Sequence, residues 1–196
     1  MANQIQVGMR KDFQSKDLWE MHRLRTRVFK ERMGWEVPVL SGMEIDGYDA
    51  IDPYYMVIRG DGNTVCGCWR MLPTEGPYML KDTFPELLHG AQAPEAANIW
   101  ELSRFAIETD GPQGFGFAGL ALDAMREIVR FGDAMGIDRY VTVTTVAIER
   151  LLRRTGIAIN RYGPALRIGV ENAVALEIDI GQQTHRALFG ELEHAA

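Results

Sequence analysis

The stretch that most constrains the fold is Ile99–Ile107, an almost continuous apolar run that carries one acid, Glu101, and one base, Arg104. Such a run predicts a strand buried on both faces. Because an unpaired buried charge is costly, these two side chains indicate a structural ion pair, strand-end charges or a functional site. In a regular strand they point to opposite faces, so they serve one site only if a bulge interrupts the strand.

The length and composition indicate an ordinary globular protein, and we expect a single domain over residues 1–196. The net charge of −6 argues against a general nucleic-acid binder. We expect no membrane span, because no apolar run reaches about 18 residues, and no secretory signal at the N-terminus. The only cysteines, Cys66 and Cys68, are typical of small buried thiols and offer a metal ion at most two ligands. We therefore predict a cytoplasmic protein without a metal site.

The order of the elements predicts a mixed sheet with helices on its faces. A hairpin is expected over 54–72, because Gly60-Asp61-Gly62-Asn63 separates two apolar runs. It is followed by strand, helix, strand and helix, an order typical of mixed α/β sheets. The predicted strands cover 3–8, 54–59, 64–72, 99–107, 138–146, 167–170 and 173–179. The predicted helices cover 15–32, 117–135, 147–155 and 184–189.

Three acids and three bases occupy apolar or loop positions where a charge needs a partner: Arg25, Asp46, Asp49, Arg70, Glu101 and Arg104. Arg25 lies in the apolar stripe of the 15–32 helix, so it either pairs with a carboxylate or extends its head group to solvent. The two aspartates belong to an acidic cluster, 44–49, in a long irregular segment. That cluster indicates a solvated turn, a metal site or a counter-charge for arginines. The whole set suits either a zwitterionic ligand or a network that fixes the segment.

Two further patterns indicate anionic partners. The segment Gln113–Ala118 precedes the 117–135 helix and fits the spacing with which acyl-CoA N-acetyltransferases hold a pyrophosphate; a helix-capping turn is the alternative. A basic cluster without any acid between positions 150 and 167 indicates a docking surface for an acidic partner or a solvated face. The cluster consists of Arg150, Arg153, Arg154, Arg161 and Arg167.

Together these residues resemble the signature of the acyl-homoserine-lactone synthases, the autoinducer synthases of bacterial quorum sensing. Eight positions carry the expected residue type in the expected order and spacing, and the resemblance covers roughly residues 4–189. They are Arg25-x3-Phe29-x5-Trp35, Asp46-x2-Asp49, Arg70 after Gly67-Cys68-Trp69, and Glu101-x2-Arg104.

The resemblance implies a GNAT-like α/β (α+β) fold. This is a three-layer sandwich with helices on both faces of a mixed sheet that is splayed into a V-shaped cleft. It also implies two substrates, S-adenosylmethionine and an acyl chain on acyl carrier protein. The amine of S-adenosylmethionine attacks the acyl thioester, and its carboxylate then closes the lactone and expels methylthioadenosine. S-adenosylmethionine is thus a substrate and no cofactor is expected; the protein is expected to be a monomer or a weak dimer.

The resemblance also implies residue roles. Glu101 is the candidate base, its proton affinity raised by burial, and Arg104 acts beside it. The S-adenosylmethionine pocket is assigned to Arg25, Phe29, Trp35 and Arg104, and the organisation of the N-terminal loop to Asp46, Asp49 and Arg70. The candidate acyl pocket consists of Met79, Phe105, Leu122, Met125, Thr142, Thr144 and Leu188. Carrier docking is assigned to Arg150, Arg153 and Arg154.

The two threonines predict a 3-oxo acyl chain, since a hydroxyl can donate to its carbonyl, and the large flexible residues predict about ten carbons or more. Two other function classes stay open from the residues alone. An acyl-CoA-dependent GNAT N-acyltransferase is favoured by the Gln113 segment. A non-catalytic S-adenosylmethionine or nucleotide sensor is disfavoured by Glu101, because a site that only binds needs no base.

Overall fold

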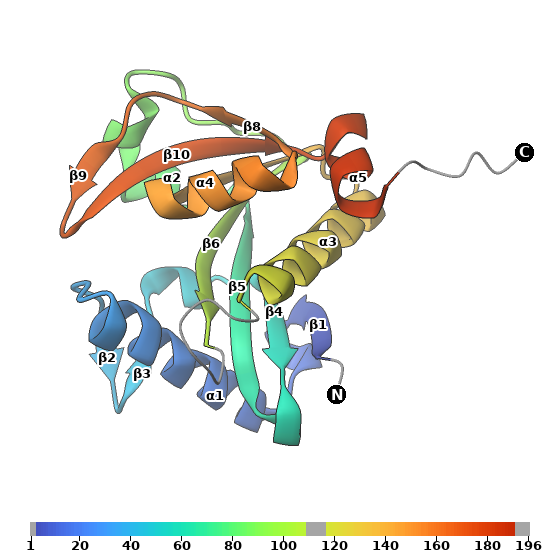
Figure 1. Ribbon diagram of the computed structural model, residues 1–196. Helices are drawn as coiled ribbons and strands as arrows, with labels where there is room; N and C mark the ends of the chain where they lie inside the picture. The colour runs from blue at the N-terminus through green and yellow to red at the C-terminus, as the bar shows by residue number, and fades with distance from the viewer. Residues whose placement is uncertain (1–2, 109–116, 191–196) are drawn as a thin grey trace, which may run out of the picture. The chain divides into compact units, whose positions relative to one another are not determined.

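The computed structural model describes residues 3–108 and 117–190 (Figure 1). Its contacts divide the chain into two compact units, each assembled from segments that are distant in the sequence. Unit 1 comprises residues 1–72 and 102–117, and unit 2 comprises residues 73–101 and 118–196. The strand β6 (Ile99–Ile107) begins in unit 2 and ends in unit 1. Within the described ranges, no helix is long and apolar enough to cross a membrane.

Unit 1 contains one end of the sheet, with the strand order β1-β4-β5-β6. Here β1 (Gln4–Met9) pairs antiparallel with β4 (Tyr54–Arg59), which pairs antiparallel with β5 (Val65–Pro73). The predicted hairpin between β4 and β5 is confirmed. Its turn places Gly62 at φ +70° and Asn63 at φ +58°, the left-handed region that glycine and asparagine tolerate best.

The helix α1 (Ser15–Arg25) covers this part of the sheet. Its buried residues Met21 and Leu24 belong to one apolar core with Tyr55 and Val57 of β4 and Cys68 of β5. The predicted 15–32 helix continues beyond α1 as a π-helix, η2 (Thr26–Arg32). A π-helical segment is uncommon and is often found at functional sites.

The segment after η2 is a loop that returns to α1. Two short strands, β2 (Val39–Leu40) and β3 (Met43–Glu44), form a hairpin, followed by the 3-10 turn η3 (Gly47–Asp49). Asp46 caps η3, because its carboxylate accepts the N–H of Tyr48 at 2.9 Å. The long segment predicted as irregular contains only these short elements, and it brings the acidic cluster 44–49 onto α1.

Unit 2 contains the other end of the sheet, with the order β6-β7-β10-β8 and with β9 paired to β10. The long strand β10 pairs antiparallel with β7, β8 and β9. The strands are β7 (Arg139–Thr145), β8 (Ala158–Arg161), β9 (Leu166–Ile168) and β10 (Glu171–Asp179). The helical segments are α2 (Met79–Asp82), η5 (Pro85–Leu88), α3 (Phe117–Met135), α4 (Val146–Thr155) and α5 (Gln182–Phe189).

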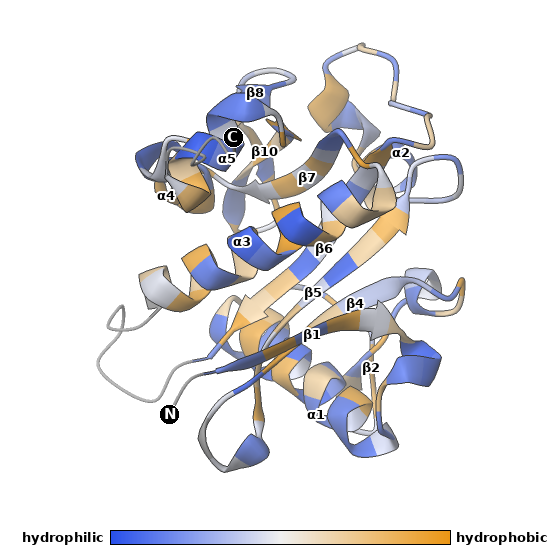
Figure 2. Ribbon diagram, turned by 90° about the vertical axis from the view of Figure 1, so that its right-hand side faces the viewer, coloured by the Kyte–Doolittle hydropathy of each residue, from blue (hydrophilic) through white to orange (hydrophobic). Residues whose placement is uncertain are grey.

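The helix α3 is amphipathic, and Figure 2 shows hydrophobic and hydrophilic residues alternating along it. Its residues Ile128 and Val129 are fully buried, and the hydroxyl of Tyr140 on β7 donates to the Ile128 carbonyl at 2.9 Å. Gly132 permits a close approach, because a Cβ there would lie 2.5 Å from Cδ1 of Ile180. A side chain at this position would require the side chain of Ile180 to shift.

Candidate functional site

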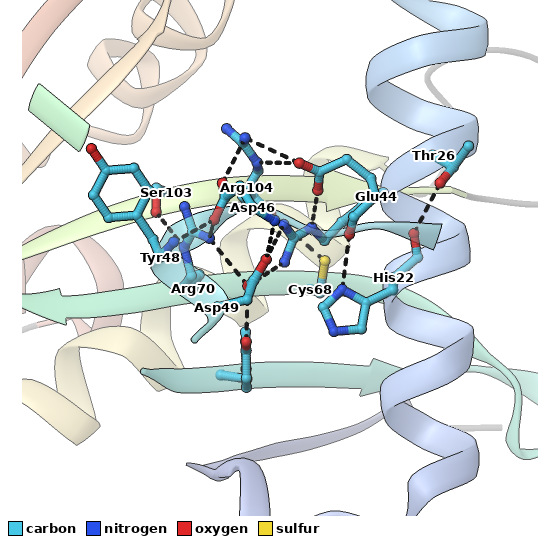
Figure 3. A network of polar contacts seen from close by, with 12 residues as sticks. His22, Thr26, Glu44, Asp46, Tyr48, Asp49, Cys68, Arg70, Ser103 and Arg104 are labelled. Carbon is cyan, nitrogen blue, oxygen red and sulfur yellow. Dashed lines mark hydrogen bonds and ion pairs between the residues drawn. The ribbon is translucent and has the colours of Figure 1, made fainter. Parts of the chain in front are cut away.

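Three arginines and three carboxylates of unit 1 form one buried ion-pair network (Figure 3). None of the six side chains is more than 11% exposed, and their formal charges cancel. They come from α1, the β3–η3 segment, β5 and β6: Arg25, Glu44, Asp46, Asp49, Arg70 and Arg104. Burial of so many charges is tolerable only because each is paired.

Arg25 has its anionic partners within the protein. Its Nη1 and Nη2 donate to the two carboxylate oxygens of Asp49 at 2.8 and 2.9 Å, and its Nε donates to Glu44. Burial disfavours the charged guanidinium, but the two carboxylates outweigh it and raise the pKa of Arg25 above its ordinary value. Arg25 therefore stays charged and bridges α1 to the loop.

Asp49 is the most heavily bonded acid of the network. Besides Arg25, it accepts from Nη1 of Arg70 at 3.1 Å, from the hydroxyl of Tyr55 at 2.8 Å and from the main-chain N–H of Asp46 at 2.9 Å. Burial tends to raise the pKa of Asp49, but the neighbouring guanidinium groups lower it below its ordinary value. These bonds hold the loop against β4 and β5.

Arg70 ties the same loop to two strands. Its Nη1 donates to Asp46 at 2.5 Å, and its Nε donates to the hydroxyl of Ser103 on β6 at 3.1 Å. The guanidinium also lies 5.4 Å from the ring centroid of Tyr48. The position of Arg70 on β5 thus links the loop, β5 and β6.

Glu44 is the network residue that the sequence interpretation missed. We expected Glu101 to be the third acid, but the structure places Glu44 there, fully buried, with Oε2 facing Arg25 and Oε1 accepting from Arg104 at 3.1 Å. The spacing of the acidic residues in the sequence could have identified Glu44. Glu44 lies two residues before Asp46 in the acidic cluster, so both face the same side of an extended segment.

Arg104 joins the network to an aromatic pair. Its Nη2 lies 2.8 Å from Oδ2 of Asp46, and its guanidinium lies 5.6 Å from the ring centroid of Phe29. Phe29 in turn stacks on Trp35, with ring centroids 5.3 Å apart and planes 12° apart. The side chains of Phe29, Trp35 and Arg104, three of the four assigned to S-adenosylmethionine, therefore lie together; the fourth, Arg25, faces the carboxylates.

The backbone of Arg104 departs from the extended geometry of the rest of β6. Its φ is +58°, a left-handed conformation that is rare for a non-glycine residue and that breaks the regular alternation of side chains along a strand. That Glu101 and Arg104 serve one site stays a prediction.

Glu101 lies in unit 2 and is fully buried. Its two carboxylate oxygens accept the main-chain N–H groups of Met79 at 2.9 Å and Leu80 at 2.7 Å, the first residues of α2. That burial raises its proton affinity stays a prediction. The carboxylate is held in one orientation by the backbone.

The residues assigned to the acyl chain are distributed unevenly. Six of the seven lie in unit 2, where Met79, Met125, Thr142 and Leu188 are buried and Leu122 and Thr144 are half-buried. The seventh, Phe105, lies in unit 1 and packs on Trp69 with ring centroids 4.5 Å apart.

Two arginines of the predicted basic cluster form ion pairs with an acid that the sequence prediction did not include. Glu149 lies just outside the acid-free window, is 2% exposed, and accepts from Arg153 at 3.0 Å and from Nε of Arg161 at 2.7 Å. Arg150 and Arg154 are exposed on α4 and have no ion pair with any residue that the structure describes. The predicted glycine-rich segment Gln113–Gly116 lies outside the described residues.

Comparisons with known proteins support the resemblance over most of the chain. A family profile described as "Autoinducer synthase" matches residues 10–188. An acyl-homoserine-lactone synthase of Pseudomonas aeruginosa is 53% identical over 188 residues, which cover 95% of this chain and 94% of the relative. The crystal structure of the acyl-homoserine-lactone synthase LasI is 53% identical, with a TM-score of 0.91, covering 96% of this chain and 95% of that one.

More distant structures agree with this. The structure of BjaI, described as a CoA-dependent acyl-homoserine lactone synthase with SAM and isopentyl-CoA, is 26% identical with a TM-score of 0.84. It covers 95% of this chain and 88% of that one. An acyl-CoA N-acyltransferase from Pseudomonas aeruginosa, 12% identical, shares the fold alone, with a TM-score of 0.60 and coverage of 90% and 99%. The predicted GNAT-like fold is thus confirmed. The chain belongs to the autoinducer synthase family and is an acyl-homoserine-lactone synthase, an acyltransferase.

Proposed function

We propose that this chain makes an acyl-homoserine lactone from S-adenosylmethionine and an acyl chain carried by acyl carrier protein, with a long 3-oxo chain in the product. The observation that carries the proposal is the contact of Arg104 with the Phe29–Trp35 stack beside a neutral ion-pair network. A cation next to aromatic rings can receive both ends of a zwitterionic sulfonium substrate.

Arg104 is the arginine of the network best suited to a ligand carboxylate. Its side chain is 9% exposed, compared with 1% for Arg25 and 0% for Arg70. Burial lowers the pKa of Arg104 below its ordinary value, whereas the carboxylates raise that of Arg25 and Arg70. Arg104 is the most exposed of the three cations, so a ligand carboxylate reaches it most readily.

Trp35 supplies a second point of recognition. Its ring stacks on Phe29, and its buried indole N–H finds no hydrogen-bond acceptor among the described residues. A buried donor without an acceptor is unfavourable, so a ligand that brings an acceptor is favoured. The aromatic face suits the sulfonium or the adenine ring of S-adenosylmethionine.

The chemistry needs a base and positioning. The ammonium of S-adenosylmethionine loses a proton to Glu101, directly or through one water, and the amine then attacks the thioester carbon. The carbon–sulfur bond breaks, and the acyl group forms an amide while the carrier thiol leaves. The substrate carboxylate next attacks its own γ-carbon, the bond to the sulfonium breaks, and methylthioadenosine departs. This second step needs only that the carboxylate be held near the γ-carbon, and we assign that task to Arg104.

We assign the acyl chain to Met79, Phe105, Leu122, Met125, Thr142, Thr144 and Leu188, because flexible apolar side chains fit flexible chains. Thr142 is buried and Thr144 half-buried on β7. A buried hydroxyl favours a substrate that accepts its hydrogen bond, which supports a 3-oxo group.

For the acyl donor, acyl carrier protein is favoured over acyl-CoA by Arg150 and Arg154 on α4, which are exposed and have no ion pair within residues 3–108 and 117–190. An acidic carrier is attracted to such a surface. Acyl-CoA is the second candidate, because BjaI is described as CoA-dependent and its structure holds isopentyl-CoA.

The test uses two parallel reactions, each containing the purified protein and S-adenosylmethionine. One reaction receives acyl carrier protein and the other receives CoA, and both donors carry the same 3-oxo acyl chain. Release of methylthioadenosine together with a lactone of matching mass supports the proposed reaction. Faster turnover with the carrier at equal concentrations supports the donor assignment, and faster turnover with CoA overturns it. Amide formation without methylthioadenosine would show that lactone closure does not occur.

A further inference from the structure

The loop that carries Glu44 is attached to the helical segment by two side chains that the family signature does not contain. Nδ1 of His22 on α1 lies 2.9 Å from the main-chain carbonyl oxygen of Glu44. The hydroxyl of Thr26, at the start of η2, lies 3.1 Å from the carbonyl oxygen of Gly42. Both acceptors belong to the β2–β3 hairpin and its turn. Figure 3 shows the His22 contact, and it shows the Thr26 hydroxyl facing a second acceptor, the main-chain carbonyl oxygen of His22 at 3.2 Å.

The protonation state of His22 follows from these contacts. Because a carbonyl oxygen can only accept, Nδ1 must carry a proton. Burial, followed by the nearby charge of Arg25, lowers the pKa of His22 below its ordinary value of 6.5, although Asp49 and Glu44 oppose this. The ring is therefore neutral at pH 7 and holds its single proton on Nδ1. Its edge faces Tyr55, with ring centroids 6.4 Å apart.

Glu44 is consequently held at two points by one face of the same helix. His22 and Arg25 are three residues apart, so they project from the same side of α1. His22 holds the main-chain oxygen of Glu44, and Arg25 holds Oε2 of its side chain. The remaining oxygen, Oε1, then faces Arg104 at 3.1 Å.

We propose that His22 and Thr26 are positioning residues: by fixing the β2–β3 hairpin on α1 they place the Glu44 carboxylate, which in turn orients Arg104 toward S-adenosylmethionine. This rests on the proposed function of Arg104. Neither side chain touches a reacting atom in this scheme. Their effect passes through Glu44, and it concerns one of the two substrates.

Paired variants separate the hydrogen bond from the volume of the side chain. His22→Asn keeps an N–H at the position of Nδ1, whereas His22→Phe keeps the ring and loses the donor. Thr26→Ser keeps the hydroxyl, and Thr26→Val keeps the branched shape without it. We expect His22→Phe and Thr26→Val to raise the KM for S-adenosylmethionine about tenfold, the equivalent of one ordinary hydrogen bond. In the Asn and Ser variants the KM for S-adenosylmethionine should stay within about threefold of the parent value. The KM for the acyl donor should be unchanged in all four variants.

A double-mutant cycle tests whether the effect passes through Glu44. In a Glu44→Gln background, His22→Phe should raise the KM for S-adenosylmethionine much less than in the parent, because its target is already altered. Full additivity of the two substitutions would overturn the proposed route. So would Asn and Phe variants of His22 that are equally impaired.

Hydrogen exchange supplies a readout that does not depend on turnover. The amides of residues 39–46 should exchange faster in His22→Phe and Thr26→Val than in their conservative partners. Unchanged exchange in both would overturn the proposal, and if one variant does not fold, the other pair still decides. If the parent does not consume S-adenosylmethionine, the proposed function fails, while the exchange result still reports whether the two residues fix the hairpin.

Discussion

Replacing Glu44 by glutamine tests whether the ion-pair network is a single electrostatic unit. Glu44 is fully buried and compensates both Arg25 and Arg104, so the substitution keeps the shape but leaves three arginines facing two carboxylates. Removal of one partner from a buried ion pair typically costs about 3–5 kcal/mol, because the remaining charge stays desolvated. For a chain of this length that corresponds to a fall in Tm of roughly 6–20 °C.

The assay is urea unfolding at pH 7, with the parent and both variants measured under the same conditions. The matched control is Glu127→Gln on α3, which removes one partner of the exposed i,i+3 pair Arg130–Glu127. An exposed pair of this type contributes about 0.5 kcal/mol or less, so the control should barely change the midpoint. A loss below about 1 kcal/mol in Glu44→Gln would refute the view that its charge is required for the network.

Three further predictions concern the acyl donor, the product and the pH. Changing both Arg150 and Arg154 to glutamate should raise the KM for acyl carrier protein severalfold without altering the KM for S-adenosylmethionine, as measured by steady-state kinetics; parallel rises in both would indicate misfolding instead. Thr144→Val should lower the ratio of 3-oxo to unsubstituted lactone in mass spectra of competing-substrate reactions, and an unchanged ratio would contradict the assignment of its hydroxyl. Because the pKa of His22 is lowered in the folded state, the unfolded chain takes up a proton first as the pH falls below about 6.5. The free energy of unfolding should therefore fall between pH 7.5 and 5.5, and it should fall by more in the parent than in His22→Asn. Both proteins contain His185, whose pKa the hydrogen bond to Asp133 raises, so its contribution drops out of the comparison.

The parts of the fold that were predictable are those with strong periodicity. The bounds expected for the strand 99–107 and the helix 117–135 agree with β6 and α3. Buried strands and long amphipathic helices produce continuous patterns, so their ends are visible in the sequence. By contrast, the short strand β8 was not predicted, because a strand of four residues with two exposed positions gives no usable alternation.

The π-helix and the partners of the charges were also beyond prediction from sequence. The periodicity of residues 26–32 fits a helix but does not specify how many residues each turn contains. The charged residues could be found, since they occupy apolar or loop positions, but their partners lie up to 60 residues away. The exchange of Glu101 for Glu44 in the network follows from such distant contacts. The pair of Arg153 with Glu149, by contrast, is a local i,i+4 contact on α4, which the spacing of the two residues could have indicated.

The ion-pair network has a consequence for how the enzyme acquires its proposed S-adenosylmethionine site during folding. Its ion-paired partners are separated by 19 to 60 residues along the chain, and contacts of this range form only after long loops have closed. A nascent or proteolysed chain that lacks β6 has Arg25 and Arg70 but lacks Arg104, leaving three carboxylates for two cations. Competence to bind S-adenosylmethionine should therefore appear in one step, late in folding. Fragments that end before residue 104 should have no partial affinity for this substrate.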